Sequence, residues 1–445
     1  MGAAPTSAAR RLFGTDGVRG VAGEFITAEL ALSLARAATA RVQRADGRPA
    51  RVLIIRDTRE SGEMLEAAVA AGVAAAGGEA LIGGILPTPG APLLIQRHGF
   101  DLAAVLSASH NPYQDNGIKF FGPEGTKLSD AQESEIEQIV ATHDDHAGAA
   151  EHPGHVKELH GAEGDYLREL ESRFADLDLS ATRVLLDCAN GATYRVAPEI
   201  FRRLKADVDA FATEPDGRNI NAGCGSTHLE PLRAAMAEGD HHAGFAFDGD
   251  GDRVLAVDRT GAVVDGDELI ALAATHLGVD GVAVTVMTNY GFHAAMRDAG
   301  IEVATTGVGD RYVLEALRER GWALGGEQSG HIIDMGFVPS GDGIAAALLA
   351  MEALSDGELH ERHAMEKLPQ KLVNVRVRDR GALEGAAAVH AAVERESAAL
   401  EGRGRVLLRP SGTEPLVRVM VEAPTVDEAE SVCSRLVGLV EAELT

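Results

Sequence analysis

One order of segments recurs three times along the chain: an aliphatic run, a polar turn, an alanine- and leucine-rich stretch and a second aliphatic run. The first runs of these repeats are VLIIRD, VLLDCANG and VAVTVMTNYG, which begin at Val52, Val184 and Val282. Strands that alternate with helices at this spacing are typical of α/β domains with largely parallel pairing, whose polar loops gather at the strand carboxyl ends. We therefore expect three related α/β domains.

The last part of the chain departs from this order. Residues 406–408 and 416–421 predict two strands that flank a turn, and residues 426–444 predict a helix. Apolar residues at helical spacing should form one buried stripe on this helix: Val426, Ala429, Val432, Cys433, Leu436, Val437 and Val440. A smaller α+β domain follows from this pattern.

A chain of 445 residues, 45% of them hydrophobic, is too long for one core. The predicted fold is α/β, with three related α/β domains built on mixed sheets and a smaller C-terminal α+β domain. We expect the boundaries near polar seams, which gives domains at residues 1–155, 156–256, 257–368 and 369–445.

The charge of the chain excludes some classes of partner. Its 68 acidic and 41 basic residues give a formal charge of -27, which should repel nucleic acids and anionic membranes. An anionic substrate would therefore need a local basic pocket. Cys188, Cys224 and Cys433 have no disulfide or metal spacing, which favours a reducing cytoplasm and buried side chains. No apolar segment is long enough to span a membrane.

The run DGDGDR places Asp248, Asp250 and Asp252 at alternate positions, with glycines that allow a tight backbone. An EF-hand calcium loop needs glycine and glutamate where the chain has Arg253 and Arg259, so that interpretation fails. Three carboxylates leave Mg²⁺ short of ligands, as is usual where phosphate oxygens complete its coordination. A solvated acidic turn is the alternative.

Ser109 follows the apolar run 102–106 and precedes Asn111-Pro112, which bends the chain. A serine in such a loop is often only a turn or cap residue. The chain has no G-x-S-x-G elbow, which argues against an α/β-hydrolase. Because the serine occurs together with a magnesium motif, we interpret it as a hydroxyl that carries phosphate.

The segment RPSGTEP from Arg409, with Arg418 beyond it, has the parts of a phosphate-binding site: guanidinium, hydroxyl and backbone donors. An ordinary β-turn with a surface arginine is the alternative. The loop GEQSGH from Gly326 offers groups suited to sugar hydroxyls. The glycine turn 307–311 enters a helix at Tyr312, where its amides could face an anion, although a simple helix cap fits equally well.

Taken together, these motifs resemble the α-D-phosphohexomutase superfamily over the full length of the chain. Six segments occur in that family's order: FGTDGVRG from Phe13, SASHNPYQDNGIKFF from Ser107, DCANGA from Asp187, DGDGDR from Asp248, GEQSGH from Gly326 and RPSGTEP from Arg409. Within it, FGTDGVRG, GEQSGH, INAGCGSTH and LVNVRV most resemble the bacterial members that act on glucosamine phosphates.

The resemblance implies a role for each matched residue. Ser109 would carry the phosphoryl group and complete a Mg²⁺ site with Asp248, Asp250 and Asp252. Arg19 and Arg253 would stabilise the transferring group. Proton transfer would fall to Lys119, His110 or His331, with the individual roles left open. Substrate would bind to Gly309, Glu327, Ser329, Arg409, Ser411, Gly412, Thr413 and Arg418.

The resemblance also implies one Mg²⁺ per subunit, a glucosamine or glucose 1,6-bisphosphate activator, a phosphosugar substrate, a cytoplasmic homodimer and, in some relatives, contact with a diadenylate cyclase. Two alternatives stay open. The chain could act on mannose or glucose phosphates, although Glu327 and Gln328 favour glucosamine. It could also be a non-catalytic phosphosugar-binding regulator, although binding alone would not require Ser109 and the three aspartates.

Overall fold

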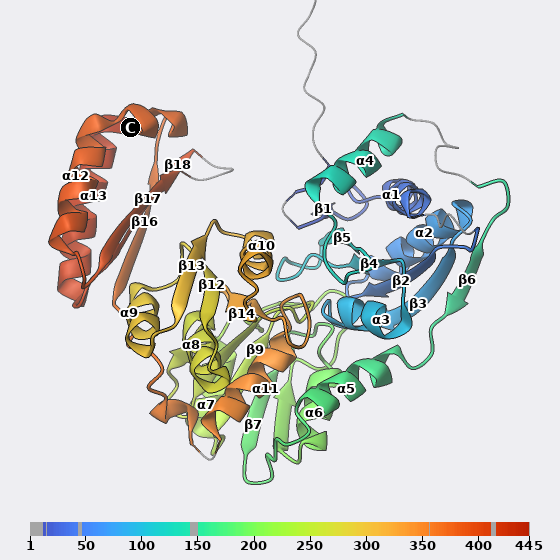
Figure 1. The fold of residues 1–445 in the computed structure, drawn as a ribbon, viewed down its shortest axis with the longest axis horizontal. Helices are drawn as coiled ribbons and strands as arrows, with labels where there is room; N and C mark the ends of the chain where they lie inside the picture. Colours follow the sequence, from blue (N-terminus) through green and yellow to red (C-terminus); the bar gives the residue numbers. More distant parts are fainter. Residues whose placement is uncertain are drawn as a thin grey trace, which may run out of the picture. The chain divides into compact units, whose positions relative to one another are not determined.

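The computed structural model describes residues 12–14, 16–42, 47–142, 150–355, 357–410 and 415–444. The chain divides into two compact units, Met1–Val286 with Ala304–Arg362, and Met287–Val303 with His363–Thr445 (Figure 1). Three of the sheets belong to the first unit. The boundary between the units falls within β13, an edge strand of the third sheet. The second unit holds the fourth sheet.

The first sheet has six strands in the order β1-β5-β4-β2-β3-β6. Strand β2 pairs in parallel with β3 and β4, whereas β5 is antiparallel to β4 and β1. The strands are β1 (Val18–Val21), β2 (Arg51–Arg56), β3 (Glu79–Ile85), β4 (Leu102–Leu106), β5 (Asp115–Phe121) and β6 (His155–Glu158). The predicted boundary after residue 155 falls within β6, which pairs with β3.

Four helices accompany this sheet: α1 (Ala28–Arg41), α2 (Gly62–Ala75), α3 (Gly90–His98) and α4 (Asp130–Ala141). The connections β2-α2-β3 and β3-α3-β4 run in opposite directions along the sheet, so right-handed crossovers put α2 and α3 on opposite faces (Figure 1). Helix α4 begins with a capping box in which Ser129 and Gln132 each accept a backbone N–H hydrogen bond from the other.

The second sheet repeats this design in the order β11-β10-β9-β7-β8. Its elements are α5 (Ala162–Arg173), β7 (Arg183–Asp187), α6 (Val196–Arg203), β8 (Asp207–Phe211), α7 (Glu230–Glu238), β9 (Ala243–Phe247), β10 (Val254–Asp258) and β11 (Val263–Val264). The predicted boundary after residue 256 falls within β10, which pairs antiparallel with β9.

The third sheet has the order β13-β12-β14-β15. Its elements are α8 (Gly266–Leu277), β12 (Gly281–Thr285), α9 (Tyr290–Ala299), β13 (Glu302–Thr306), α10 (Asp310–Arg320), β14 (Leu324–Gly326), β15 (Ile332–Asp334) and α11 (Gly343–Leu354), followed by the short 3₁₀ helix η1 (Leu359–Glu361).

The repeated order positions the functional motifs. In each of the three sheets, the strand that pairs in parallel with the first strand of the repeat (β4 with β2, β9 with β7 and β14 with β12) is followed by an antiparallel neighbour (β5, β10 or β15). The loops that connect these pairs carry Ser109, Asp248 and Glu327 respectively. The three motifs therefore occupy equivalent loops, and in open α/β sheets ligands bind at such carboxyl ends, where the connections diverge.

In the second unit, β16 (Gln370–Arg376), β18 (Leu416–Glu422) and β17 (Arg405–Pro410) form an antiparallel sheet in that order. Helices α12 (Ala387–Ala399) and α13 (Val426–Leu444) pack with it, and η2 (Arg380–Gly385) precedes α12. The predicted stripe on α13 lies in this core with one exception. Val426 is 59% exposed because it is the first residue of the helix, so its predicted burial is wrong.

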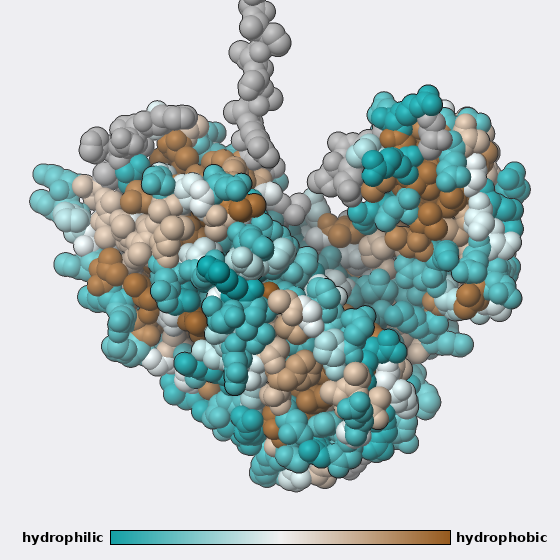
Figure 2. Space-filling model, turned by 180° about the vertical axis from the view of Figure 1, so that it is seen from behind, coloured by the Kyte–Doolittle hydropathy of each residue, from teal (hydrophilic) through white to brown (hydrophobic). Residues whose placement is uncertain are grey.

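The remaining sequence expectations concern burial and surface. All three cysteines are free and buried, as predicted. Among the described residues, no helix is both long and apolar enough to cross a membrane. Figure 2 shows that hydrophilic residues cover most of the visible face, with apolar residues in separate groups between them.

Candidate active site

Ser109 lies in the loop after β4, where its side chain is directed at the aspartates that follow β9. The residue is 1% exposed, and its Oγ donates a 2.5 Å hydrogen bond to Asp248 Oδ2. Nδ1 of the neighbouring His110 lies 3.3 Å from Ser109 Oγ. The backbone of Ser109 has a φ of 52°, in the left-handed region that a residue with a side chain rarely adopts.

Asp248, Asp250 and Asp252 form the centre of the site. One carboxylate oxygen from each lies within 4.8 Å of the others, and all three residues are buried. Asp250 Oδ2 accepts hydrogen bonds from Thr88 Oγ1 at 2.7 Å and Lys119 Nζ at 2.8 Å. The other oxygens, Asp250 Oδ1 and Asp252 Oδ1, are buried and have no hydrogen-bond partner among the described residues.

These carboxylates fit a hard divalent cation. Burial and the neighbouring Asp252 and Asp250 raise the pKa of Asp248 well above its ordinary value, because three negative charges share one small space. Burial would also raise the pKa of Asp252, but Lys119 and His331 lower it overall. Carboxylate oxygens that are buried, mutually repelling and without a hydrogen bond are what a magnesium-type ion binds. This cluster is a metal site.

Cationic side chains surround the triad. Lys119 is 1% exposed, and its Nζ lies 2.8 Å from Asp250, 3.3 Å from Asp16 and 3.8 Å from Asp252. Burial would lower the pKa of Lys119, but these carboxylates raise it overall, so the amine is protonated. Arg253 Nε lies 3.8 Å from Asp252 Oδ1, and Arg19 pairs with Asp16.

Both arginines keep donor capacity for an anion. Nε of Arg19 and Nε of Arg253 are buried and lack a hydrogen-bond partner within the described part of the chain. Burial lowers the pKa of His110, and the charges of Arg253 and Arg19 lower it further, so this imidazole is neutral near pH 7. The site therefore combines a neutral imidazole beside the serine oxygen, a protonated amine and a guanidinium group beside the triad, and a second guanidinium group beside Asp16.

His331 lies closer to the metal triad than the predicted sugar loop suggested. It is 3% exposed, and its Nδ1 faces Asp252 Oδ2 at 3.6 Å. Its Nε2 accepts a hydrogen bond from the Gly341 amide at 3.1 Å, which leaves the ring proton on Nδ1. Burial lowers the pKa of His331, but Asp252 and Asp310 raise it overall.

Three charged residues that the sequence analysis did not single out extend this network: Asp16, Lys127 and Asp310. Lys127 Nζ donates to Asp310 Oδ2 at 2.6 Å and also to Asp16. Asp310 Oδ2 in turn lies 3.7 Å from His331 Nε2. Asp16 lies inside the FGTDGVRG segment and Asp310 inside the glycine turn, so both belong to motifs that the sequence analysis identified. Lys127 belongs to no such motif.

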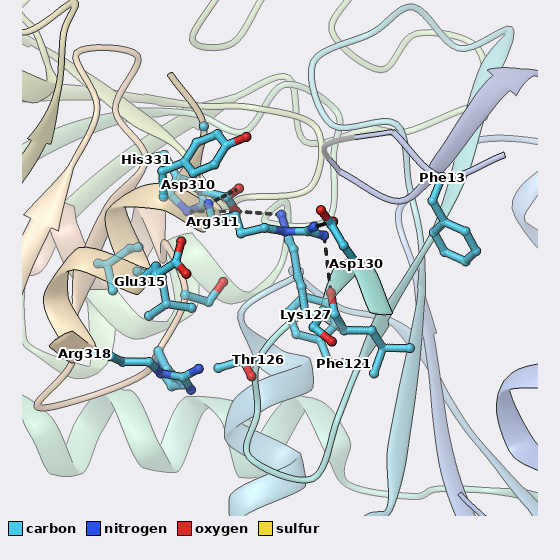
Figure 3. A pocket seen from close by; sticks show the side chains of 18 of the residues that line it. Phe13, Phe121, Thr126, Lys127, Asp130, Asp310, Arg311, Glu315, Arg318 and His331 are labelled. Atoms are coloured by element: carbon cyan, nitrogen blue, oxygen red, sulfur yellow. Dashed lines mark hydrogen bonds and ion pairs between the residues drawn. The ribbon is translucent and has the colours of Figure 1, made fainter. Parts of the chain in front are cut away.

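Lys127 bridges the loop before α4 to the start of α10 (Figure 3). A cavity of about 760 Å³ lies beside this bridge, lined by Phe13, Phe121, Thr126, Lys127, Arg311 and Arg318 among others. Arg311 crosses the same junction to pair with Asp130 and with Glu133 at 3.1 Å. These contacts fix α10 against α4.

The sugar loop follows β14. Glu327 is buried, and its Oε1 accepts a hydrogen bond from the Gly309 amide at 3.1 Å, which joins two predicted substrate-binding residues. Ser329 is exposed. Gln328 Nε2 donates to Asp265 Oδ2 at 3.3 Å. Helix α10 begins at Asp310, two residues earlier than predicted.

The predicted phosphate cradle lies in the second unit. Arg409 in β17 and Arg418 in β18 are directly opposite in the antiparallel pair, so their side chains share a face. Burial lowers the pKa of Arg409, and the Arg418 charge lowers it further. Arg418 Nε is buried and has no hydrogen-bond partner among the described residues. Two facing guanidinium groups favour an anion. Ser411, Gly412 and Thr413 lie outside the described residues.

Four family models match the chain in order. They are the phosphoglucomutase/phosphomannomutase alpha/beta/alpha domain I at residues 10–147, domain II at 160–261, domain III at 265–372 and the C-terminal domain at 372–439. A relative from Deinococcus deserti, named phosphoglucosamine mutase, is 48% identical over 97% of this chain and 98% of its own. One of the same name from Saccharopolyspora erythraea is 50% identical over 97% and 99%.

Solved structures share the fold. A phosphoglucomutase/phosphomannomutase family protein from Burkholderia thailandensis superposes with a TM-score of 0.83 at 23% identity, over 97% of each chain. The N-acetylphosphoglucosamine mutase of Aspergillus fumigatus, solved with GlcNAc-6P and magnesium, gives a TM-score of 0.64 at 17% identity, over 98% of this chain and 96% of that one.

Proposed function

Because this chain belongs to the phosphoglucomutase/phosphomannomutase family, we propose that it interconverts glucosamine 6-phosphate and glucosamine 1-phosphate. Relatives that are 48–50% identical over nearly their whole length carry the name of that activity. The chain is thus an isomerase that relocates a phosphoryl group on a sugar. Its product would supply the synthesis of UDP-N-acetylglucosamine.

The observation that carries the mechanism is the 2.5 Å contact between Ser109 Oγ and Asp248 Oδ2, in a triad where two buried carboxylate oxygens accept no hydrogen bond from the described residues. In the proposed active form, Ser109 carries a phosphoryl group. Transfer breaks the bond between phosphorus and Ser109 Oγ and forms one to O1 of glucosamine 6-phosphate, which gives a 1,6-bisphosphate. The sugar then reorients, its 6-phosphoryl group returns to Ser109, and glucosamine 1-phosphate leaves.

The surrounding side chains supply charge and protons. Neutral His110, 3.3 Å from Ser109 Oγ, is suited to exchange a proton with that oxygen. Protonated Lys119 and the Nε groups of Arg19 and Arg253, which donate no hydrogen bond to the described residues, are suited to bind the oxygens of the transferring phosphoryl group. Lys119 and His331 remain candidates for the proton transfer at the sugar hydroxyl.

The metal site would hold Mg²⁺ through Asp248, Asp250, Asp252 and Ser109, one ion per subunit. When bound, Mg²⁺ offsets negative charge on the phosphoryl group. A glucosamine or glucose 1,6-bisphosphate would act as activator by phosphorylating Ser109. Gly309, Glu327 and Ser329 would bind the sugar, and Arg409, Ser411, Gly412, Thr413 and Arg418 would bind the phosphate that is not being transferred.

The first experiment measures kcat/KM for glucosamine 6-phosphate, glucose 1-phosphate and mannose 1-phosphate, with Mg²⁺ and a trace of 1,6-bisphosphate. We expect a strong preference for glucosamine in the wild type and no turnover in Ser109→Ala. Preference for glucose or mannose would replace the substrate but keep the chemistry. Substantial activity of Ser109→Ala would overturn the phosphoserine mechanism. Binding without turnover in the wild type would favour a regulatory role.

Association and location remain proposals from the resemblance. We propose a cytoplasmic homodimer, which light scattering of the purified chain would test by its mass. Contact with a diadenylate cyclase would be tested by whether the purified chain lowers the rate of such an enzyme. A monomeric mass or an unchanged cyclase rate would reject the corresponding proposal.

A further inference from the structure

Backbone carbonyl groups of the Ser109 loop converge on one buried side chain, that of Arg59. Its Nη2 donates to the Ser109 carbonyl at 2.8 Å and to the Asn111 carbonyl at 2.9 Å. Its Nη1 donates to the Asp115 carbonyl at 3.0 Å and also to that of Pro112. Arg59 is 1% exposed, so a change in the shape of this loop would leave a buried charge without partners.

The charge of Arg59 is balanced from the same segment. Asp57 Oδ2 accepts from Arg59 Nε at 2.8 Å and from Ser107 Oγ at 2.6 Å. Ser107 Oγ in turn accepts the Ser109 amide at 2.9 Å. Strands β2 and β4 are parallel neighbours, so the segment after β2 and the loop after β4 leave the same edge of the sheet. Asp57 and Arg59 therefore hold Ser109 through both its amide and its carbonyl.

A second clamp comes from the domain that carries the metal loop. Asn221 Nδ2 donates to the Ser109 carbonyl at 2.9 Å and to the Asn111 carbonyl at 3.1 Å. Gly249 of the metal loop packs against the same point: a Cβ there would lie 2.6 Å from the Ser109 carbonyl oxygen and 2.7 Å from Asn221 Nδ2. The Ser109 carbonyl thus lies between Arg59, Asn221 and the metal loop.

This arrangement explains how Ser109 keeps a left-handed φ of 52° that is unfavourable for a residue with a side chain. We propose that Arg59 and Asn221 are positioning residues for phosphoryl transfer, an inference that rests on the proposed function. They bind the carbonyl of Ser109 and leave its Oγ free. By fixing the backbone, they direct Oγ at Asp248, and a small displacement of a reacting atom can reduce a rate about 100-fold.

The test compares Asn221→Ala, and the isosteric Asn221→Asp that lacks the amide donors, with the wild type. We expect kcat to fall by about 10- to 100-fold with KM for glucosamine 6-phosphate nearly unchanged. Asn221→Asp should be at least as impaired, because its carboxylate faces two carbonyl oxygens. Asn219→Ala is the matched control: its side chain bonds to Glu214 and Asp216, not to the Ser109 loop, so kcat should stay near the wild-type value.

Arg59→Lys tests the first clamp, with Arg56→Lys as its control, since Arg56 pairs with Glu63 and Glu66 instead. Intact mass gives the phosphorylated fraction of Ser109, so that kcat is expressed per phosphorylated site. A wild-type kcat per site in both Asn221 variants would overturn the inference, as would a loss confined to KM. If the wild type lacks mutase activity, the proposed function fails instead, which separates the two failures.

Discussion

At the scale of the residue, the site depends on unequal environments for chemically identical groups. Burial and two neighbouring carboxylates raise the pKa of Asp248, whereas Lys119 and His331 outweigh burial and lower that of Asp252. The same sequence motif supplies both residues. The difference arises because Lys119 reaches one side of the triad from β5 and His331 reaches it from the loop between β14 and β15.

Arg409→Ala should raise KM for the phosphosugar about 10-fold or more with a smaller effect on kcat, because a charge-assisted phosphate contact contributes roughly 1.5–3 kcal/mol. Steady-state kinetics with glucosamine 6-phosphate measures this. Arg403→Ala is the control, since Arg403 pairs with Glu428 on the surface of the same unit and its loss should leave KM unchanged. An unchanged KM in Arg409→Ala would remove this residue from the phosphate site.

Asp342 gives a prediction about pH. It caps α11 by accepting from the Ile344 and Ala345 amides, and Tyr166 donates to it at 2.9 Å. Burial raises its pKa to about 6. Since the folded state holds this proton more tightly than the unfolded chain, stability falls as pH rises from about 4 to above 6, by roughly 3 kcal/mol at most.

Asp342→Asn keeps a capping oxygen but cannot ionise, so its advantage over the wild type should grow between pH 4.5 and pH 7.5. The measurement is the difference in Tm between variant and wild type at each of the two pH values. The contributions of the other titrating groups cancel in this difference, because both proteins contain them. The same difference at both would show that Asp342 does not titrate in this range.

At the scale of the element, three equivalent loops do different work. The loops after β4, β9 and β14 have the same place in their sheets, but they carry a serine, an aspartate triad and the glutamate that we propose binds the sugar. Helix α10 joins the third of these domains to the first, because Asp310 at its start binds Lys127 and Arg311 binds the first turns of α4. Three copies of one arrangement of strands thus bring a serine, three aspartates and a glutamate into loops at equivalent positions.

Lys127→Met should destabilise the first unit by no more than about 3 kcal/mol, because it removes the cation of half-buried Asp310 and one of the three cations beside half-buried Asp16. Adding Asp310→Asn removes one of the two charges and should restore part of the loss. Urea unfolding of the wild type, Lys127→Met and the double variant measures both effects. If the second substitution brought no recovery, the pairing of Lys127 with Asp310 would contribute little to stability.

At the scale of the whole molecule, the chain concentrates local positive charge within a strongly acidic protein. Its formal charge is -27, yet Lys119 and Arg253 lie beside the triad, and Arg19 pairs with Asp16, which Lys119 also contacts. Anionic substrate is therefore attracted at short range, where burial strengthens each interaction, while the rest of the surface disfavours other polyanions.

Magnesium should raise the Tm of the wild type, since an ion that binds only the folded chain at 100 times its Kd adds about 2.7 kcal/mol. Asp252→Asn should lose most of this shift, and EDTA should abolish it in the wild type. Asp258→Asn is the control, because Asp258 is a buried aspartate that pairs with Arg362 outside the triad. Equal shifts in all three proteins would place the ion elsewhere.

The sequence by itself determined the kinds of elements, the strands and helices of three α/β repeats, and the motifs that carry chemistry. Local patterns suffice for these, because aliphatic runs, glycine turns and carboxylate spacing act over a few residues. The same local patterns indicate a metal triad and a serine, and together they resemble one superfamily over the whole chain. The apolar pattern was wrong at the end of a helix: Val426 fits the helical spacing of the buried stripe but is exposed, because it is the first residue of α13.

Tertiary structure alone decided which groups meet. Arg59 and Asn221 are 162 residues apart in the sequence, yet both donate to the carbonyl of Ser109. Lys127 lies between Asp16 and Asp310, and His331 lies between Asp252 of the triad and Asp310. These contacts depend on the order of strands in three sheets and on how those sheets pack, which no local pattern contains. The protonation states of the site follow from the same packing, because burial and neighbouring charge set each pKa.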